Sequence, residues 1–144
     1  MKIEPMTAAD FAELAAWRYE PPYDFYDGDQ EEPLNPERFF AARDDDGGDL
    51  IGFYYFEPVG AALDYGLGLR PDLTGQALGL DFFRSGLEFG REHYRPSVMR
   101  LHVAAFNERA IKVYERAGFR EVGRHVRTFE RWGDVEFITM DEQP

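Results

Sequence analysis

"LRPDLTGQALG", the stretch Leu69–Gly79, places two glycines and an alanine in a short loop behind a proline. The segment before the loop, Ala61–Leu69, is predicted to be a strand. Arg70 and Pro71 end it, because proline cannot donate to a β-ladder and disfavours helical backbone in the residue before it. The segment after the loop, Gly79–Tyr94, has a helical period. A strand–loop–helix junction directs backbone N–H groups toward an anion. The stretch therefore predicts a phosphate-binding turn, with glycines that serve tight turning alone as the alternative.

The loop matches neither of the two commonest glycine-rich nucleotide motifs. A Walker loop needs GxxxxGK followed by Ser or Thr, which the sequence lacks. A Rossmann fingerprint needs GxGxxG directly after a first strand, whereas this loop follows the fourth predicted strand and has the spacing Gly75, Ala77, Gly79. The sequence therefore favours neither ATP nor NAD as the ligand.

The composition bounds the class of protein. A chain of 144 residues with 44% hydrophobic content predicts a single domain, residues 1–144, with a core of its own. No run of apolar residues is long enough to cross a membrane, and Met1–Pro5 lacks the apolar core of a signal peptide, so we expect a cytoplasmic protein. The absence of cysteine excludes disulfides, thiolate metal sites and cysteine nucleophiles, and no metal site is predicted.

The charge is strongly acidic and unevenly distributed. The net charge is −12, which argues against nucleic acid as a partner because phosphate backbones need clustered Lys and Arg. Residues 1–83 carry 18 acids and 5 bases, whereas residues 84–144 carry 10 acids and 11 bases. The first part therefore suits a cationic partner, unless the acidic surface serves only to keep the protein dissolved.

The other expected elements follow from periodicity and from capping residues. Thr7 is a candidate N-cap. The remaining strands are expected at Lys2–Met6, Phe39–Arg43, Leu50–Phe56, Arg100–Ala104, Val122–Glu130 and Val135–Met140, and the remaining helices at Ala8–Tyr19 and Glu108–Arg116. The resulting order, β-α-β-β-β-α-β-α-β-β, predicts an α/β (α+β) sheet with helices packed on both faces.

A second motif, "NERAIKVYERAGF", covers Asn107–Phe119 and predicts a one-faced helix with Asn107 as its N-cap and Gly118 as its C-terminal stop. Together the two motifs resemble the GNAT superfamily of acyl-CoA-dependent N-acyltransferases. The family loop pattern Gln/Arg-x-x-Gly-x-Gly/Ala falls on Thr74–Gly79. The family pattern Asn-x-x-Ala-x-x-x-Tyr-x-x-x-Gly-Phe falls on Asn107, Ala110, Tyr114, Gly118 and Phe119. The order of predicted strands also resembles the family across essentially the whole chain.

The resemblance implies a fold and a cofactor. The fold is a mixed central sheet of about six to seven strands, splayed between the fourth and fifth strands and flanked by about four helices. The cofactor is acetyl-CoA, a co-substrate that the family holds with its loop, the strand before it and the second motif. The implied binding residues are Leu67, Gly68, Leu69, Thr74, Gly75, Gln76, Ala77, Leu78, Gly79, Asn107, Ala110 and Tyr114.

Two of these residues depart from the family pattern. Thr74 stands where the family has Arg or Gln, which removes a side-chain donor to the pyrophosphate, and Ala77 stands where the family has Gly. We expect residue 77 to have negative φ, because alanine with positive φ costs about 1–2 kcal/mol.

The reaction implied is direct attack of a primary amine on the thioester in a ternary complex. The backbone N–H of Leu67 is the expected oxyanion donor, with that of Leu69 as the alternative. Tyr114 is the expected general acid for the thiolate, since the pKa of a phenol is about 10; the alternative is an ordinary aromatic on the buried helix face. Asp64 or Glu57 is the expected base, with His102 behind them. His93 and His125 are expected on the surface.

The acceptor site is predicted between the first helix and the second strand. Trp17, Tyr19, Tyr23 and Tyr26 lie among acidic residues and could form a cleft for a cation, or they could cap the core under a long loop. The partner is a small-molecule or protein amine, and the chain is expected to be a monomer or a homodimer. An alternative function is a non-catalytic acyl-CoA-binding or regulatory module of the same fold.

Overall fold

The computed structural model describes residues 1–29, 35–46, 48–75 and 78–144. The chain forms two compact units. The first unit consists of Met1–Tyr55 and Leu67–Gly79, and the second unit consists of Phe56–Gly66 and Leu80–Pro144.

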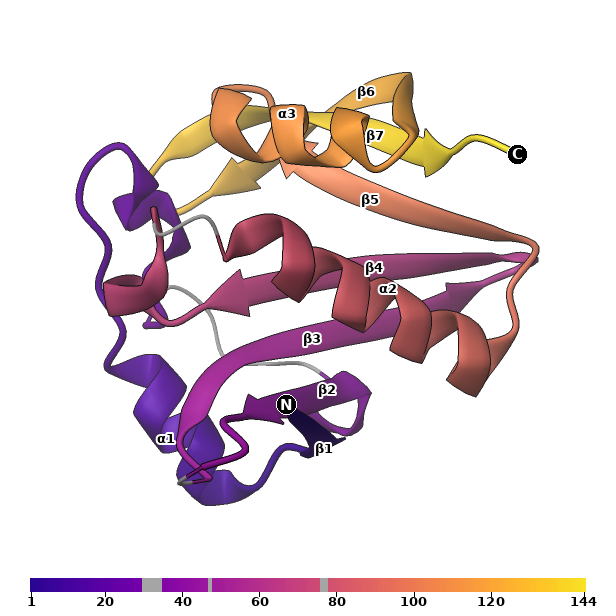
Figure 1. Cartoon of the computed structure of the whole chain (residues 1–144). Helices are drawn as coiled ribbons and strands as arrows, with labels where there is room; N and C mark the ends of the chain where they lie inside the picture. The colour runs from indigo at the N-terminus through magenta and orange to yellow at the C-terminus, as the bar shows by residue number, and fades with distance from the viewer. Residues whose placement is uncertain (30–34, 47, 76–77) are drawn as a thin grey trace. The chain divides into compact units, whose positions relative to one another are not determined.

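The described residues form one seven-stranded sheet in the order β1-β2-β3-β4-β5-β7-β6 (Figure 1). The strands are β1 (Lys2–Pro5), β2 (Phe39–Arg43), β3 (Leu50–Val59), β4 (Ala62–Leu69), β5 (Val98–Ala104), β6 (Phe119–Phe129) and β7 (Gly133–Glu142). β4 pairs with β5 in parallel, while the pairs β1–β2, β2–β3, β5–β7 and β6–β7 are antiparallel. The predicted mixed sheet and the predicted order of elements are confirmed.

Three α-helices occur in the described part of the chain, where about four helices were expected. They are α1 (Ala8–Ala15), α2 (Gly79–Tyr94) and α3 (Glu108–Arg116), and the remaining helical turns are the 3-10 segments η1 (Tyr23–Tyr26), η2 (Pro36–Arg38) and η3 (Pro71–Leu73). The bounds of α2 and α3 agree with the sequence expectation, whereas α1 is four residues shorter than the predicted Ala8–Tyr19.

The early end of α1 has a cause far along the chain. The Gly28 N–H donates to the Trp17 carbonyl (3.0 Å), so the chain returns across the end of the helix. A Cβ at Gly28 would lie 1.7 Å from the Leu14 carbonyl oxygen. Only glycine permits this close backbone approach. The contact with Gly28 takes the place of a further turn of α1, and the helical periodicity of the sequence does not predict it.

The start of α1 is fixed by charge and capping in the first unit. The Asp10 N–H donates to the Thr7 hydroxyl (3.2 Å) and the Thr7 N–H donates to the Asp10 carboxylate (2.9 Å), which confirms Thr7 as the N-cap. Arg43 bridges Asp10 (2.6 Å) and Glu4 (2.6 Å). Burial opposes ionisation of Asp10, but its hydrogen bonds with Thr7 and Arg43 outweigh burial and hold its pKa below the usual range.

The strands of the second unit have one apolar face and one polar face. On β4, Leu63 and Tyr65 are buried, and the Tyr65 hydroxyl donates to the Phe83 carbonyl of α2 (2.8 Å). Asp64 lies between them in sequence, so its side chain points to the opposite face. The pairing of Asp64 with Arg100 places the polar side chains of β5 on this same face.

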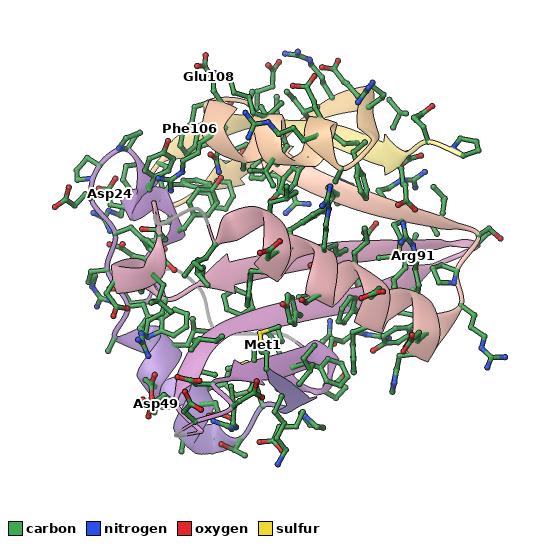
Figure 2. All side chains as sticks on the ribbon, viewed as in Figure 1. Met1, Asp24, Asp49, Arg91, Phe106 and Glu108 are labelled. Atoms are coloured by element: carbon green, nitrogen blue, oxygen red, sulfur yellow. The ribbon has the colours of Figure 1, made fainter. Side chains whose placement is uncertain are left out.

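The end of β7 is tied to two other elements of the second unit. Asp141 accepts two hydrogen bonds from the Arg100 guanidinium of β5 (2.7 and 3.0 Å), and Glu142 forms an ion pair with Arg91 of α2. Arg91 is labelled on α2 in Figure 2. These contacts fix the last strand of the chain between β5 and β6.

Replacement of Gly28 by alanine tests the close approach at the end of α1. We expect Gly28→Ala to lower the free energy of unfolding by about 2 kcal/mol, because the added Cβ meets backbone that cannot move aside. Urea denaturation measures the change. The matched control is Gly123→Ala on β6, where a Cβ has nothing within 4 Å, and the expected change is within about 0.5 kcal/mol. Equal stability of the two variants would contradict this account.

Candidate functional site

The segment between β4 and α2 is a turn held by its own side chains. Arg70 donates two hydrogen bonds to Asp72 (2.6 and 3.1 Å) at the start of η3. The Thr74 hydroxyl donates to the Pro71 carbonyl (2.8 Å), so its donor is used inside the turn. Gly75 follows with φ +75°, which favours glycine. Gln76 and Ala77 lie outside the described residues, so the predicted negative φ of Ala77 stays a prediction.

Packing does not explain the glycines of this turn. A Cβ at Gly68 would lie 2.2 Å from the Phe53 ring, so Gly68 makes room for that ring. A Cβ at Gly75 or Gly79 would meet nothing within 4 Å. Gly75 is required by its backbone conformation, whereas neither conformation nor a neighbour among the described residues requires glycine at Gly79. The described ends of the turn therefore leave backbone open beside the first turn of α2, an arrangement suited to a phosphate group.

Tyr19 lies against the strand that precedes this turn. Its hydroxyl donates to the Leu69 carbonyl (2.6 Å), and its backbone N–H donates to the Asp27 carboxylate (2.7 Å). Burial, and then the Asp27 charge, raise the pKa of Tyr19, so this hydroxyl stays protonated as a donor. One carbonyl of the proposed binding segment Leu67–Leu69 is thus already bonded within the first unit.

The four aromatic residues predicted for the acceptor site have different surroundings. Trp17 is 6% exposed and packs in a core cluster with Ala41 and Leu50, with Tyr19 beside it. Tyr23 is half-buried in η1, and Tyr26, at the end of the same turn, is 38% exposed. Among these four, Tyr23 and Tyr26 have ring surface to offer a ligand, whereas Trp17 contributes to the core.

The second motif builds α3 in the second unit. The Asn107 side chain accepts a hydrogen bond from the Ala110 N–H (3.1 Å), which confirms the predicted N-cap. The turn that leads into the helix is marked by Phe106 and Glu108 in Figure 2. Gly118, with φ +95°, lies just beyond the end of the helix, as the sequence predicts.

Tyr114 projects from α3 onto α2. Its ring centroid lies 4.9 Å from that of Phe83, and Phe83 also contacts the buried Phe119 (5.6 Å). Tyr114 itself is half-buried. This placement fits an aromatic that packs on the core, and it leaves part of the side chain in reach of a ligand.

A row of polar side chains crosses the polar face of the second unit. Asp64 Oδ2 lies 3.2 Å from His102 Nε2, and His102 Nδ1 lies 3.2 Å from Thr139 Oγ1. Thr139 Oγ1 lies 3.4 Å from His125 Nδ1. We call these four residues the Asp64 row. Glu57, the other candidate base, is half-buried on β3.

The position of His125 corrects the expectation that it lies on the surface. It is half-buried, and its ring stacks on Phe137 (5.6 Å). Burial, and then the charges of Arg127 and His102, lower its pKa. Sequence reasoning missed the row because its four members come from four strands whose register the sequence does not state. The available signal was that His102, His125 and Thr139 each fall in a predicted strand.

No group of three or more His, Cys, Asp or Glu residues among the described residues could hold a metal ion. No helix in the same residues is long and apolar enough to cross a membrane.

Comparison with known proteins identifies the family. A family model described as the acetyltransferase (GNAT) family matches residues 8–119. The chain therefore belongs to this family, in agreement with its mixed sheet, its parallel β4–β5 pairing and the two motifs.

The curated relatives are longer proteins. The chain is 35% identical over 142 residues to a mycothiol acetyltransferase of Acidothermus cellulolyticus, a match that covers 87% of this chain and 41% of that protein. It is 40% identical over 91 residues to a mycothiol acetyltransferase of Streptomyces coelicolor, which covers 60% of this chain and 28% of that protein. The chain thus spans less than half the length of these relatives.

Solved structures share the fold at low sequence identity. A spermidine N-acetyltransferase chimera of Vibrio cholerae has a TM-score of 0.72 at 19% identity, with 99% of this chain and 96% of that chain covered. A ribosomal-protein-alanine N-acetyltransferase of Brucella melitensis has a TM-score of 0.72 at 17% identity, with both chains fully covered.

The two open glycines of the turn differ in a way that stability measurements can resolve. We expect Gly75→Ala to lower the free energy of unfolding by about 1 kcal/mol, because alanine resists the positive φ at this position. Gly79→Ala, at an equally open position in the first turn of α2, should leave stability unchanged or raise it. Urea denaturation of both variants measures the difference, and the same loss in both would refute the conformational role of Gly75.

Proposed function

We propose that this protein transfers the acetyl group of acetyl-CoA to a primary amine, by direct attack of the amine on the thioester in a ternary complex. The observation that carries the proposal is the turn before α2, where Gly79 serves neither packing nor backbone conformation. Backbone that is kept open beside a helix N-terminus is what a pyrophosphate requires. The family to which the chain belongs supports acetyl-CoA as the source of that pyrophosphate.

The family patterns assign binding residues in each unit. In the first unit, the turn Thr74–Gly79 holds the pyrophosphate through backbone N–H groups, and Leu67–Leu69 offers its remaining backbone groups to the pantetheine arm. In the second unit, the family pattern assigns Asn107 and Ala110 at the start of α3 to binding of acetyl-CoA. Thr74 adds little, since its hydroxyl donates to Pro71.

The chemistry requires an oxyanion donor and two proton-transfer groups. The amine nitrogen bonds to the thioester carbon, and the Leu67 N–H stabilises the oxyanion that forms on the carbonyl. The C–S bond then breaks, and Tyr114 gives a proton to the departing thiolate. A carboxylate, Asp64 or Glu57, takes the proton that the ammonium must lose before attack.

The acceptor we propose is cationic. Residues 1–83 carry the excess of acids, and Tyr23 and Tyr26 flank Asp24 in η1. The solved structures with this fold include enzymes named for spermidine, which is an amine of this class, and for a ribosomal protein alanine. The curated relatives are named for mycothiol. A cytoplasmic location and a monomeric or homodimeric state stay predictions.

A non-catalytic acyl-CoA-binding module is the second candidate. The engagement of the Thr74 hydroxyl within its own turn favours it, because the turn then lacks a side-chain donor at the position where the family has Arg or Gln. Binding of acetyl-CoA without transfer to any amine would support this candidate.

Calorimetric titration with acetyl-CoA tests the binding site. We expect micromolar affinity for acetyl-CoA and no binding of ATP or NAD. Gly79→Asp should weaken acetyl-CoA binding about tenfold or more, because it places bulk and negative charge beside the phosphates. The variant should still fold, since a carboxylate in the first turn of a helix is favourable.

Gly123→Asp is the matched control for this substitution. It adds the same charge to β6, where a Cβ has open space, and it should leave the affinity unchanged. Unaltered binding by Gly79→Asp would make the turn a structural feature only. Absence of acetyl-CoA binding by the unmodified protein would overturn the proposed function.

Replacement of the Tyr114 hydroxyl tests the general acid. We expect Tyr114→Phe to lower kcat about 10²-fold while the KM for acetyl-CoA stays nearly constant, because only the proton donor is lost and the ring contact with Phe83 remains. Steady-state kinetics measure both values. The control is Tyr94→Phe, which removes the hydroxyl of the last residue of α2 and should leave kcat unchanged. Unchanged turnover by Tyr114→Phe would remove this residue from the mechanism.

A further inference from the structure

We propose that Asp64 is the group that takes the proton from the acceptor ammonium, and that His102, Thr139 and His125 hold its carboxylate in position through a directed chain of hydrogen bonds. The role of Asp64 rests on the proposed function, whereas the chain of hydrogen bonds does not. Of the two candidate bases, Asp64 and Glu57, the base is Asp64, and three further residues position its carboxylate.

The strand register places the four side chains on one face of the second unit. Asp64 pairs with Arg100, and His102 is two residues further along β5, so both project to the same face. His102 pairs with Thr139 of β7. His125 of β6 pairs with Phe137, two residues before Thr139. Four neighbouring strands thus contribute one residue each, and the contacts of 3.2, 3.2 and 3.4 Å follow from this register.

The direction of the hydrogen bonds follows from the end of the row. An ionised Asp64 can only accept, so His102 Nε2 carries the proton and donates to Oδ2. In the tautomer that carries its proton on Nε2, His102 accepts at Nδ1, and the Thr139 hydroxyl donates to it. The Thr139 oxygen in turn accepts from Nδ1–H of His125. The lowered pKa of His125 keeps this ring neutral at neutral pH and supports the assignment.

The other oxygen of Asp64 is not satisfied by the described part of the protein. Asp64 Oδ1 is buried and has no hydrogen-bond partner among the residues that the structure describes. A buried carboxylate oxygen without a partner is costly, and an N–H of an ammonium group satisfies it. Two guanidinium groups of this unit are engaged elsewhere, since Arg100 is held by Asp141 and Arg127 lies over the Phe137 ring. Among the described residues, none of these groups bonds to Oδ1.

Asp64 and Tyr114 lie toward opposite faces of β4. Tyr65, the neighbour of Asp64, directs its hydroxyl to the Phe83 carbonyl, and Tyr114 packs on the Phe83 ring. Asp64 points the other way, and the next residue on its face is Gly66, which has no side chain. In the proposal, Asp64 takes the proton of the amine on one face of β4, and Tyr114 protonates the thiolate from the other.

Each proton that leaves a group in the proposed reaction is taken up by another group. The ammonium R–NH3⁺ gives one proton to Asp64 Oδ1 and becomes R–NH2, whose lone pair forms the new N–C bond. After the C–S bond breaks, the thiolate takes a proton from Tyr114, and the tyrosinate regains one from the nitrogen of the new amide. The proton on Asp64 passes to solvent after the acetylated product leaves, which restores the carboxylate.

The pH dependence of acetylation tests the role of Asp64. At pH 7 we expect Asp64→Asn to lower kcat/KM for the amine about 10²-fold or more. The loss should narrow toward pH 10, because the fraction of free amine rises tenfold per pH unit below an amine pKa of about 10 and the base becomes unnecessary. The KM for acetyl-CoA should not change. Glu130→Gln, which removes an exposed carboxylate just beyond the end of β6, is the control, and its activity should follow the unmodified protein at every pH. Glu57→Gln tests the other candidate base, and a loss that it causes should not narrow as the pH rises.

The hydrogen-bond row can be tested without activity. The sequence has three histidines, so the imidazole nitrogen NMR spectrum is simple to assign. At neutral pH we expect the Nε2–H tautomer for His102 and the Nδ1–H tautomer for His125. Thr139→Val should abolish the tautomer preference of His125 and leave His93 unaffected. Thr128→Val, the same substitution at an exposed site on β6, should change neither ring of the row.

Each outcome bears on a separate part of the proposal. A loss in Asp64→Asn that is constant with pH, or a pH-dependent loss in Glu57→Gln instead, would overturn Asp64 as the proton acceptor. Histidine spectra that do not respond to Thr139→Val would overturn the row. Failure of the unmodified protein to bind acetyl-CoA or to acetylate any amine would overturn the proposed function and the role of Asp64, while the spectra would still decide whether the row exists.

Discussion

The parallel pairing of β4 with β5 is the constraint on which the proposed site depends. Antiparallel neighbours can be joined by a two-residue turn, but parallel neighbours need a crossover connection of a dozen or more residues. Here the crossover is the turn after Leu69 and the helix α2, so a helix N-terminus follows directly on the end of β4. The pairing itself covers Ala62–Asp64 and Val98–Arg100, the first three residues of each strand. This register also brings Asp64 and His102 to one face.

Local signals made much of the fold predictable. The caps at Thr7 and Asn107, the stop at Gly118 and the bounds of α2 and α3 each depend on residues within one or two helical turns, and all of them are confirmed. The predicted end of α1 was wrong, because the observed end depends on Gly28, which lies well after the helix in sequence and packs against its last turn. Such a contact leaves no periodic trace in the helix sequence.

The candidate site also has one part that local sequence signals predict and one part that they do not. The turn around Gly75 and the residues of α3 follow from two motifs that are contiguous in sequence. The Asp64 row does not, because its members are separated by up to 75 positions of chain between Asp64 and Thr139 and meet only through register. Alternation along a strand tells which residues share a face of that strand, but not which face its neighbour presents. Trp17 is buried in the core and Tyr26 is exposed, and residue type alone could not predict which of the two aromatic residues faces a ligand.

The place of β7 in the sheet has a consequence for how the protein is made. β7 is the last strand in sequence, yet it lies between β5 and β6 in the sheet. During synthesis β5 and β6 emerge first, and each lacks its neighbour until Gly133–Glu142 has left the ribosome. The β5–β7 and β6–β7 pairs can therefore form only after β7 has been translated. A pause in translation near Phe129 would prolong the time in which two unpaired strand edges are open to other chains.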